Sequence, residues 1–267
     1  MHLRAIHAET DIPTLQTFIR SNPLGILTTA LKNPSYPLLQ SSHIPFVLDT
    51  DTPRAPDGEE EKDEKKKNLG TLRGHLARAN PQAKALIDAL VAQQAETGET
   101  GAGELSEEVL ILFNAPESHY VTPKFYTETK PSTGKVVPTW NYAAVQVYGK
   151  IRVYADSKSE ETGEFLQRQI EDLSEACETG IMGYTKEGAW KVDDAPDRYV
   201  DVMKRAIMGV EITIERLEGK WKMSQEMGVG DREGVVRGFE GLGSDVARDV
   251  ARLVRERGEM KEKAKMS

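Results

Sequence analysis

The segment KVVPTWNYAAVQVYGKIRVYADS, residues 135–157, decides the fold of this chain. From Val145 onward, apolar residues alternate with polar or aromatic ones, which is the pattern of a β-strand with one face on a core. The preceding residues 138–142, PTWNY, gather a proline, a tryptophan and an asparagine at the mouth of that strand. The segment therefore predicts contact with a planar, polar-edged ligand. A buried tryptophan flanked by turn residues is the structural alternative.

The rest of the chain supplies further strands and helices around this one. Short β-rich segments occur at 25–31, 38–48, 69–76, 109–113 and 210–217. Helical periodicity and capping residues predict helices at 12–20, 80–94, 160–177, 196–206 and 244–257. Several strands follow one another without an intervening helix. The pattern therefore favours an antiparallel β-barrel with peripheral helices, an α+β fold, over a doubly wound parallel sheet.

Composition and charge narrow the class of protein. The 267 residues are 38% hydrophobic and 29% charged, with a formal net charge of −8. Binding to nucleic acid usually depends on clustered lysine and arginine, so this charge argues against direct DNA binding. The N-terminus lacks the features of a secretory signal, and no apolar run approaches the roughly 18 residues of a membrane span. With Cys177 as the single cysteine, we expect a reduced, cytoplasmic protein without membrane attachment.

The segment RGHLARANP, residues 73–81, predicts a site for a phosphate group. It places His75 and two arginines at a strand end, directly before a helix that Asn80 caps. A helix N-terminus carries partial positive charge, and arginine binds phosphate through several hydrogen bonds. The alternative is that Arg73 and Arg78 are ordinary surface charges and that Asn80 is only a cap.

A second basic segment, EGKWKMSQ at residues 218–225, strengthens this interpretation. Lys220 and Lys222 alternate with Trp221 along a strand, so the two lysines share a face. A wet strand face opposite a core tryptophan is the alternative. A phosphate site beside aromatic, polar strand ends is what flavin mononucleotide (FMN) requires. His43 and His75 lack a third ligand at suitable spacing, so we predict no metal site.

Four blocks of sequence carry a resemblance to a known family. They are HIPFVLD (43–49), LRGHLARANPQ (72–82), KVVPTWNYAAVQVYGKIRVY (135–154) and EGKWKMSQ (218–225). In this order they resemble the signature blocks of the PaiB-type FMN-binding negative transcriptional regulator family. The resemblance extends over about residues 1–235, and the two longest blocks make it specific.

The resemblance implies an FMN-binding split β-barrel like that of pyridoxamine-phosphate oxidases, in a homodimer with FMN at the subunit interface. It also implies which residues bind the cofactor. The flavin would be lined by Ser42, His43 and Ile44. The phosphate or ribityl group would be held by His75, Arg78 and Asn80. The site would be closed by Thr139, Trp140 and Asn141, and the other side or the other subunit would contribute Lys220, Trp221, Lys222 and Ser224.

The same resemblance divides the chain into two parts. Residues 1–235 form the FMN-binding split-barrel domain, and residues 236–267 form a C-terminal amphipathic helix with a charged tail. The domain contains a charged insertion at 51–68, predicted to be disordered, and a glycine-rich segment at 95–106, predicted to be a flexible loop. Both insertions make these loops longer than those of the compact bacterial members of the family.

The resemblance leaves the activity open. The preferred hypothesis is an FMN-dependent oxidoreductase that acts on a small molecule, with no catalytic residue assigned. The alternative is a transcriptional regulator that responds to FMN or another ligand. The family's description favours it, but the sequence shows no helix-turn-helix with a basic recognition face. A third, weaker alternative is haem binding or degradation, which another branch of split-barrel proteins performs.

Overall fold

The computed structural model describes residues 1–50, 68–98 and 100–266. Its internal contacts divide the chain into two compact units. The barrel unit comprises Gln16–Phe113 and Gln146–Leu217, and the helix-hairpin unit comprises Met1–Leu15, Asn114–Val145 and Glu218–Ser267. The predicted insertion at 51–68 lies, except for Asn68, outside the described residues.

The barrel unit is built on an antiparallel sheet. Its strands follow the order β3-β2-β6-β8-β9-β5-β4. Their bounds are β2 Leu24–Ala30, β3 Leu39–Pro45, β4 Val47–Asp49, β5 Thr71–Ala77, β6 Gly103–Asn114, β8 Thr139–Tyr154 and β9 Ile207–Lys222. β8 and β9 are long, and their residues 139–145 and 218–222 belong to the helix-hairpin unit.

The sheet of the barrel unit curls on itself. β3 and β4 stand at opposite ends of the hydrogen-bonded path, yet only Phe46 separates them in the chain. Gly74 in β5 lies so close to β3 that an added Cβ would be 3.0 Å from Ile44 Cγ2 and 2.9 Å from Phe46 Cε1. The hydrogen-bonded path therefore ends at β3 and β4, and β3 packs beside β5, which gives a split barrel. The predicted α+β fold with an antiparallel split β-barrel is confirmed.

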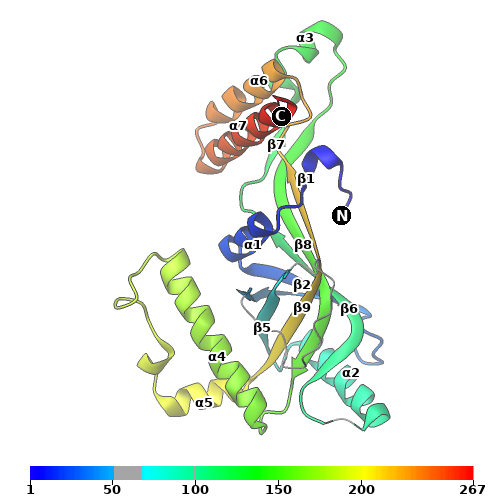
Figure 1. The fold of residues 1–267 in the computed structure, drawn as a ribbon, viewed down its shortest axis with the longest axis vertical. Helices are drawn as coiled ribbons and strands as arrows, with labels where there is room; N and C mark the ends of the chain where they lie inside the picture. The colour runs from blue at the N-terminus through cyan, green and yellow to red at the C-terminus, as the bar shows by residue number, and fades with distance from the viewer. Residues whose placement is uncertain (51–67, 99, 267) are drawn as a thin grey trace. The chain divides into compact units, whose positions relative to one another are not determined.

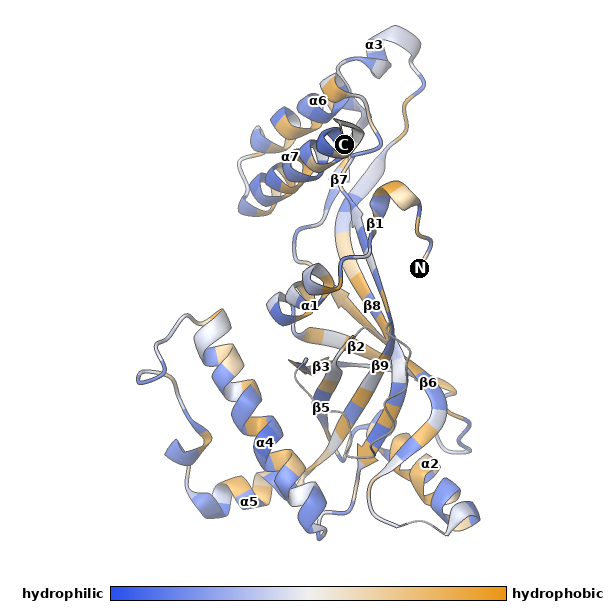
Figure 2. Ribbon diagram, in the orientation of Figure 1, coloured by the Kyte–Doolittle hydropathy of each residue, from blue (hydrophilic) through white to orange (hydrophobic). Residues whose placement is uncertain are grey.

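Alternating burial defines the interior of the barrel. Hydrophobic and hydrophilic residues alternate along β9 (Figure 2), and Val210 and Ile212 are fully buried. β8 alternates in the same way from Val145 to Val153, as predicted from its sequence. In β6, residues 109–113 also alternate, because Val109, Ile111 and Phe113 are buried while the residues between them are half-exposed. Although residues 109–113 are all apolar, only Val109, Ile111 and Phe113 therefore point into the core.

Helices flank the barrel. They are α1 Ile12–Ser21, α2 Pro81–Thr97, α4 Glu160–Ala176 and α5 Asp197–Arg205. α4 packs against β4 and β5, and α5 lies beside α4 (Figure 1). The loop predicted at 95–106 is shorter than expected: α2 continues to Thr97, and β6 begins at Gly103.

The helix-hairpin unit adds two short strands to the ends of β8 and β9. β1 Ala8–Glu9 pairs with β9, and β7 His119–Val121 pairs with β8. The helices of this unit are α3 Thr129–Thr133, α6 Val229–Glu240 and α7 Asp245–Met266. α6 and α7 lie side by side (Figure 1), and Val250 and Val254 of α7 are fully buried. The predicted boundary between 235 and 236 falls inside α6.

Shorter helical turns complete the chain: η1 Ala5–His7, η2 Pro123–Phe125, η3 Cys177–Ile181 and η4 Val192–Asp194. Within the described ranges, none of the helices combines the length and the apolar character that crossing a membrane requires.

Candidate functional site

The predicted site residues fall into two groups, one in each unit. Ser42, His43, Ile44, His75, Arg78 and Asn80 belong to the barrel unit, and we call them the turn group. Thr139, Trp140, Asn141, Lys220, Trp221, Lys222 and Ser224 belong to the helix-hairpin unit, and we call them the strand-end group. The structure brings residues together within each group, and each group is described within its own unit.

Asn80 joins the start of α2 to β3. Its Oδ1 accepts a hydrogen bond from the Gln82 backbone N–H at 2.8 Å, so it caps the helix as predicted. Its Nδ2 donates to Ser42 Oγ at 2.9 Å. Pro81 takes the first helical position, where the missing N–H is tolerated. The order of Asn and Pro in the sequence thus fixes the helix start and orients Ser42.

Arg78 is one of two residues of the turn group whose side chains have unpaired nitrogen atoms among the described residues. It lies half-buried just beyond the end of β5, and its backbone N–H donates to Ala206 O at 2.9 Å. Its Nε and Nη2 atoms are buried and have no hydrogen-bond partner in the described part of the chain. Burial lowers the pKa of Arg78, and the charge of Asp156 opposes this shift only in part. An anion at this position would satisfy both nitrogens.

His75 presents a second unpaired nitrogen. It is half-buried on β5, and its Nδ1 is buried without a partner among the residues described. Burial lowers the pKa of His75, which favours the neutral imidazole. A neutral ring offers one donor and one acceptor, so it suits a hydroxyl group better than it suits a phosphate.

Arg73 differs sharply from Arg78, although both lie in the segment 73–81. It is 1% exposed, and its guanidinium donates to Asp49 at 2.5 and 3.0 Å, to Asp172 at 2.6 Å and to Gln169 at 3.3 Å. The view of Arg73 as an ordinary surface charge is therefore wrong, because α4 covers it and its donors are engaged.

The other two members of the turn group point in different directions. His43 is exposed, whereas Ile44 is 2% exposed and belongs to the barrel core. Residues two apart on a strand share a face, so Ser42 lies on the same face as Ile44, and His43 lies on the opposite one. Only the Ser42 side of β3 is tied to the turn at Asn80.

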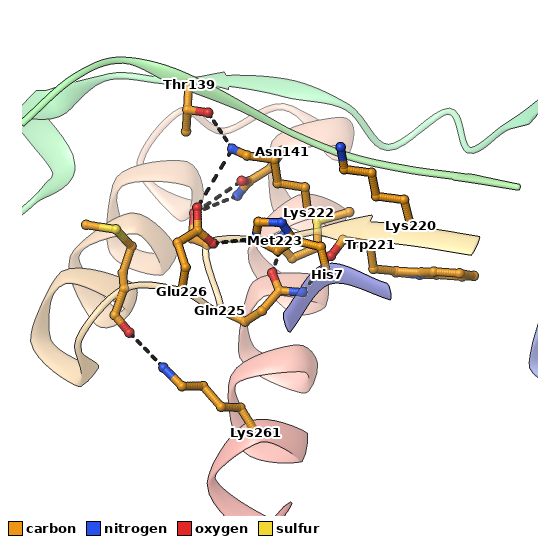
Figure 3. A network of polar contacts seen from close by, with 12 residues as sticks. His7, Thr139, Asn141, Lys220, Trp221, Lys222, Met223, Gln225, Glu226 and Lys261 are labelled. Atoms are coloured by element: carbon orange, nitrogen blue, oxygen red, sulfur yellow. Dashed lines mark hydrogen bonds and ion pairs between the residues drawn. The ribbon is translucent and has the colours of Figure 1, made fainter. Parts of the chain in front are cut away.

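The strand-end group is centred on Lys222 (Figure 3). Its Nζ donates to Thr139 Oγ1 and, at 3.0 Å, to the backbone oxygen of Trp140, and it lies 3.8 Å from a carboxylate oxygen of Glu226. His7 Nε2 lies 3.0 Å from the other carboxylate oxygen of Glu226. The end of β9, the start of β8 and the N-terminal segment are thus held together by one small network.

Burial and charge act in opposite directions at this network. Burial by itself would raise the pKa of Glu226, but the hydrogen bond with His7 and the charge of Lys222 hold it below its ordinary value. For Lys222, burial lowers the pKa and the charge of Glu226 opposes the shift. The carboxylate is therefore ionised at neutral pH, and it serves as the counter-ion for the Lys222 ammonium group.

Three predicted residues of the strand-end group are engaged inside their own unit. Asn141 and Ser224, which are 0% and 1% exposed, exchange two hydrogen bonds of 3.1 Å. Ser224 adopts a positive φ of 56°, which an ordinary L-residue rarely does. Trp221 is 6% exposed and lies under Arg257, whose guanidinium is 4.5 Å from its ring centroid. These side chains fix the end of β9.

Trp140 and Lys220 keep exposed atoms. Trp140 is 55% exposed and forms an edge-to-face pair with Tyr120, while Lys220 lies 5.4 Å from the ring centroid of Tyr142. Sequence reasoning missed His7 and Glu226 as members of this network. The signal available for Glu226 was its position directly after the block EGKWKMSQ, whereas nothing local marks His7.

The sequence of this chain matches a known protein family. Residues 1–216 match the family described as "Putative FMN-binding domain". The chain belongs to this FMN-binding family. An uncharacterized protein of the fungus Aspergillus fumigatus is 63% identical to this chain over 266 residues. The match covers 98% of this chain and 100% of that protein.

A bacterial relative extends the similarity. The protein of Bacillus subtilis named "Protease synthase and sporulation protein PAI 2" is 22% identical over 258 residues, 96% of this chain and 98% of its own. The predicted resemblance to the PaiB-type FMN-binding family is confirmed. Among solved structures, the flavocytochrome Anf3 from Azotobacter vinelandii matches with a TM-score of 0.41 and 11% identity over 83% of this chain and 72% of that one, a likeness too weak to bear on function.

Proposed function

We propose that this protein binds FMN and that the phosphate group of the cofactor lies at the turn between β5 and α2. The observation that carries the proposal is the side chain of Arg78, whose Nε and Nη2 atoms are buried without a partner in the described residues. Buried donors without acceptors are destabilising, and a phosphate supplies several acceptor oxygens with compensating negative charge. The N-terminus of α2, three residues further on, adds a favourable dipole.

The remaining residues of the turn group suit the rest of the cofactor. His75 Nδ1 and the Ser42–Asn80 pair would bond the ribityl hydroxyls or the phosphate. FMN, when bound, supplies the redox chemistry through its ring system, while the protein contributes binding, orientation and electrostatics. We further propose a homodimer in which the strand-end group of one subunit closes the site of the other. The resemblance to split-barrel flavoproteins supports this arrangement.

The first test is FMN affinity of Arg78→Ala. We expect the dissociation constant of FMN to rise about tenfold to a hundredfold, because a hydrogen bond to a charged group contributes about 1.5–3 kcal/mol. Titration of the apoprotein with FMN, followed by flavin fluorescence, measures the dissociation constant. Sedimentation of the same samples should show a dimer that contains one FMN per chain. Arg198→Ala is the matched control, since Arg198 is an exposed arginine of the same unit.

A second variant separates binding from folding. Asn80→Asp keeps a good helix cap but replaces the donor to Ser42 by a negative charge beside the proposed phosphate. We expect weaker FMN binding with an unchanged thermal midpoint of the apoprotein. Unchanged FMN affinity in both Arg78→Ala and Asn80→Asp would show that the phosphate lies elsewhere.

We propose that this protein is an oxidoreductase that uses bound FMN to act on a small molecule. The expected result is that NADH or NADPH, added without oxygen, bleaches the visible flavin absorption of the holoprotein. Flavin-free Arg78→Ala protein mixed with FMN at the same concentration is the control for direct reduction in solution. No reduction, together with salt-sensitive binding to a specific DNA sequence, would favour the regulatory alternative. The net charge of −8 makes that outcome the less expected one.

A further inference from the structure

Three aromatic side chains, two of them exposed and Tyr142 half-buried, lie together in the helix-hairpin unit. Trp140 and Tyr142 are alternate residues of β8 and therefore share one face of the strand. Tyr120 of β7 stands directly opposite Trp140, with ring centroids 6.3 Å apart and planes at 71°. Trp140 is 55% exposed and Tyr120 is 43% exposed. We call Tyr120, Trp140 and Tyr142 the aromatic face.

A positive charge borders the aromatic face. Lys220 Nζ lies 5.4 Å from the ring centroid of Tyr142 and donates to the backbone oxygen of His2 at 3.0 Å. In the described part of the chain, no carboxylate lies within ion-pair distance of Lys220. Lys222 differs, because its ammonium group is engaged with Thr139, the Trp140 backbone and Glu226. Lys220 is therefore the cation that a ligand on the aromatic face would meet.

Further positive charge surrounds this position. Burial lowers the pKa of Lys222, and the charges of Lys220 and Arg4 lower it further. The charge of Glu226 acts in the opposite direction. Lys220 and Arg4 thus lie close enough to Lys222 to repel its charge. Two carboxylates stand near these cations: Glu226, which Lys222 shares with His7, and Glu218, which lies two residues before Lys220 on β9 and pairs with the N-terminal ammonium group. The local field favours an anion and disfavours a cationic partner.

We propose that the aromatic face and Lys220 bind a planar aromatic anion, and that this is the substrate class of the protein. The inference rests on the proposed function, because it names the substrate of an FMN-dependent oxidoreductase. The rings of Trp140 and Tyr120 provide stacking surface, and Lys220 pairs with the carboxylate or another acidic group of the ligand. Stacking alone would accept any flat molecule, so the charge adds the specificity.

The experiment measures binding of three probes by isothermal titration and by quenching of tryptophan fluorescence. They are 2-naphthoate, its neutral analogue 2-naphthamide, and cyclohexanecarboxylate, which has the charge without the ring. We expect 2-naphthoate to bind tightest. Trp140→Ala should weaken its binding about tenfold, because stacking on an aromatic side chain contributes about 1–3 kcal/mol. Trp190→Ala is the matched control, since Trp190 is 48% exposed but belongs to the barrel unit.

Lys220→Gln tests the charge separately. It should weaken 2-naphthoate binding about twofold to fivefold, as expected for an exposed ion pair, and leave 2-naphthamide binding unchanged. The proposal is overturned if wild-type protein binds 2-naphthoate no better than cyclohexanecarboxylate, or if Trp140→Ala binds it as tightly as wild type.

FMN content distinguishes this inference from the proposed function. Trp140→Ala should weaken FMN binding less than Arg78→Ala does, because the phosphate site at Arg78 is untouched. If Trp140→Ala loses FMN together with the probe, the aromatic face holds the flavin and the substrate assignment is wrong, while FMN binding stands. If Arg78→Ala retains FMN and Trp140→Ala loses only the probe, the phosphate assignment fails and the aromatic face stands.

Discussion

Gly149→Ala is expected to lower the free energy of unfolding by about 3 kcal/mol or more. Gly149 lies in the middle of β8, where it crosses close to β9. A Cβ atom added there would stand 2.0 Å from the backbone oxygen of Thr213 and 3.2 Å from Ile212 Cγ2. The first of these neighbours is backbone that belongs to the central strand pair, so relief requires the two strands to separate. Urea denaturation followed by tryptophan fluorescence measures the change.

Gly163→Ala provides a control of opposite sign. Gly163 lies inside α4, and an added Cβ would meet nothing within 4 Å. Alanine is favoured over glycine in a helix interior by about 1 kcal/mol, so this variant should be more stable than wild type. The same chemical change would then destabilise at one position and stabilise at the other. A Gly149→Ala protein as stable as wild type would show that β8 and β9 do not approach each other this closely.

The barrel could be predicted because its signal is local. Alternation from Val145 to Val153 reports which face of β8 is buried, and the Asn80–Pro81 pair reports where α2 begins. α6 gave no comparable signal. Its sequence VGDREGVVRGFE contains three glycines, which lower helix propensity, yet the helix forms because it packs against α7 and η2. Tertiary packing overrides propensity there, and a single sequence does not display that packing.

The candidate site was predictable to a similar extent. The segment 73–81 correctly marked the turn at Asn80, but it could not separate Arg73 from Arg78. That difference depends on which groups meet each side chain, and α4 supplies Asp172 and Gln169 as partners of Arg73. The pair of His7 and Glu226 was out of reach for another reason. The two residues are 219 positions apart, and only the completed fold brings them to 3.0 Å.

Arg73→Met is expected to lower the free energy of unfolding by about 3 kcal/mol. Arg73 is 1% exposed, whereas its partners Asp49 and Asp172 are 21% and 40% exposed. Removing the cation leaves the carboxylates of Asp49 on β4 and Asp172 on α4 without their shared buried partner. Breaking a buried ion pair from one side costs about 3–5 kcal/mol. The partial exposure of the acids places the expected loss at the lower end. Arg73→Lys should recover only part of it, because an ammonium group cannot reproduce the fork of hydrogen bonds.

Arg168→Met is the matched control, because Arg168 contacts the same two carboxylates from the surface. It is 63% exposed and lies 3.3 Å from Asp49 and 3.4 Å from Asp172. Exposed pairs contribute less than about 1 kcal/mol, so this variant alone should be nearly neutral. In Arg73→Met, however, Arg168 is the cation that still neutralises the acids. The double variant should therefore lose more stability than the two single variants added together. Strict additivity would show that the two arginines act independently, and that burial rather than the shared carboxylates makes Arg73 important.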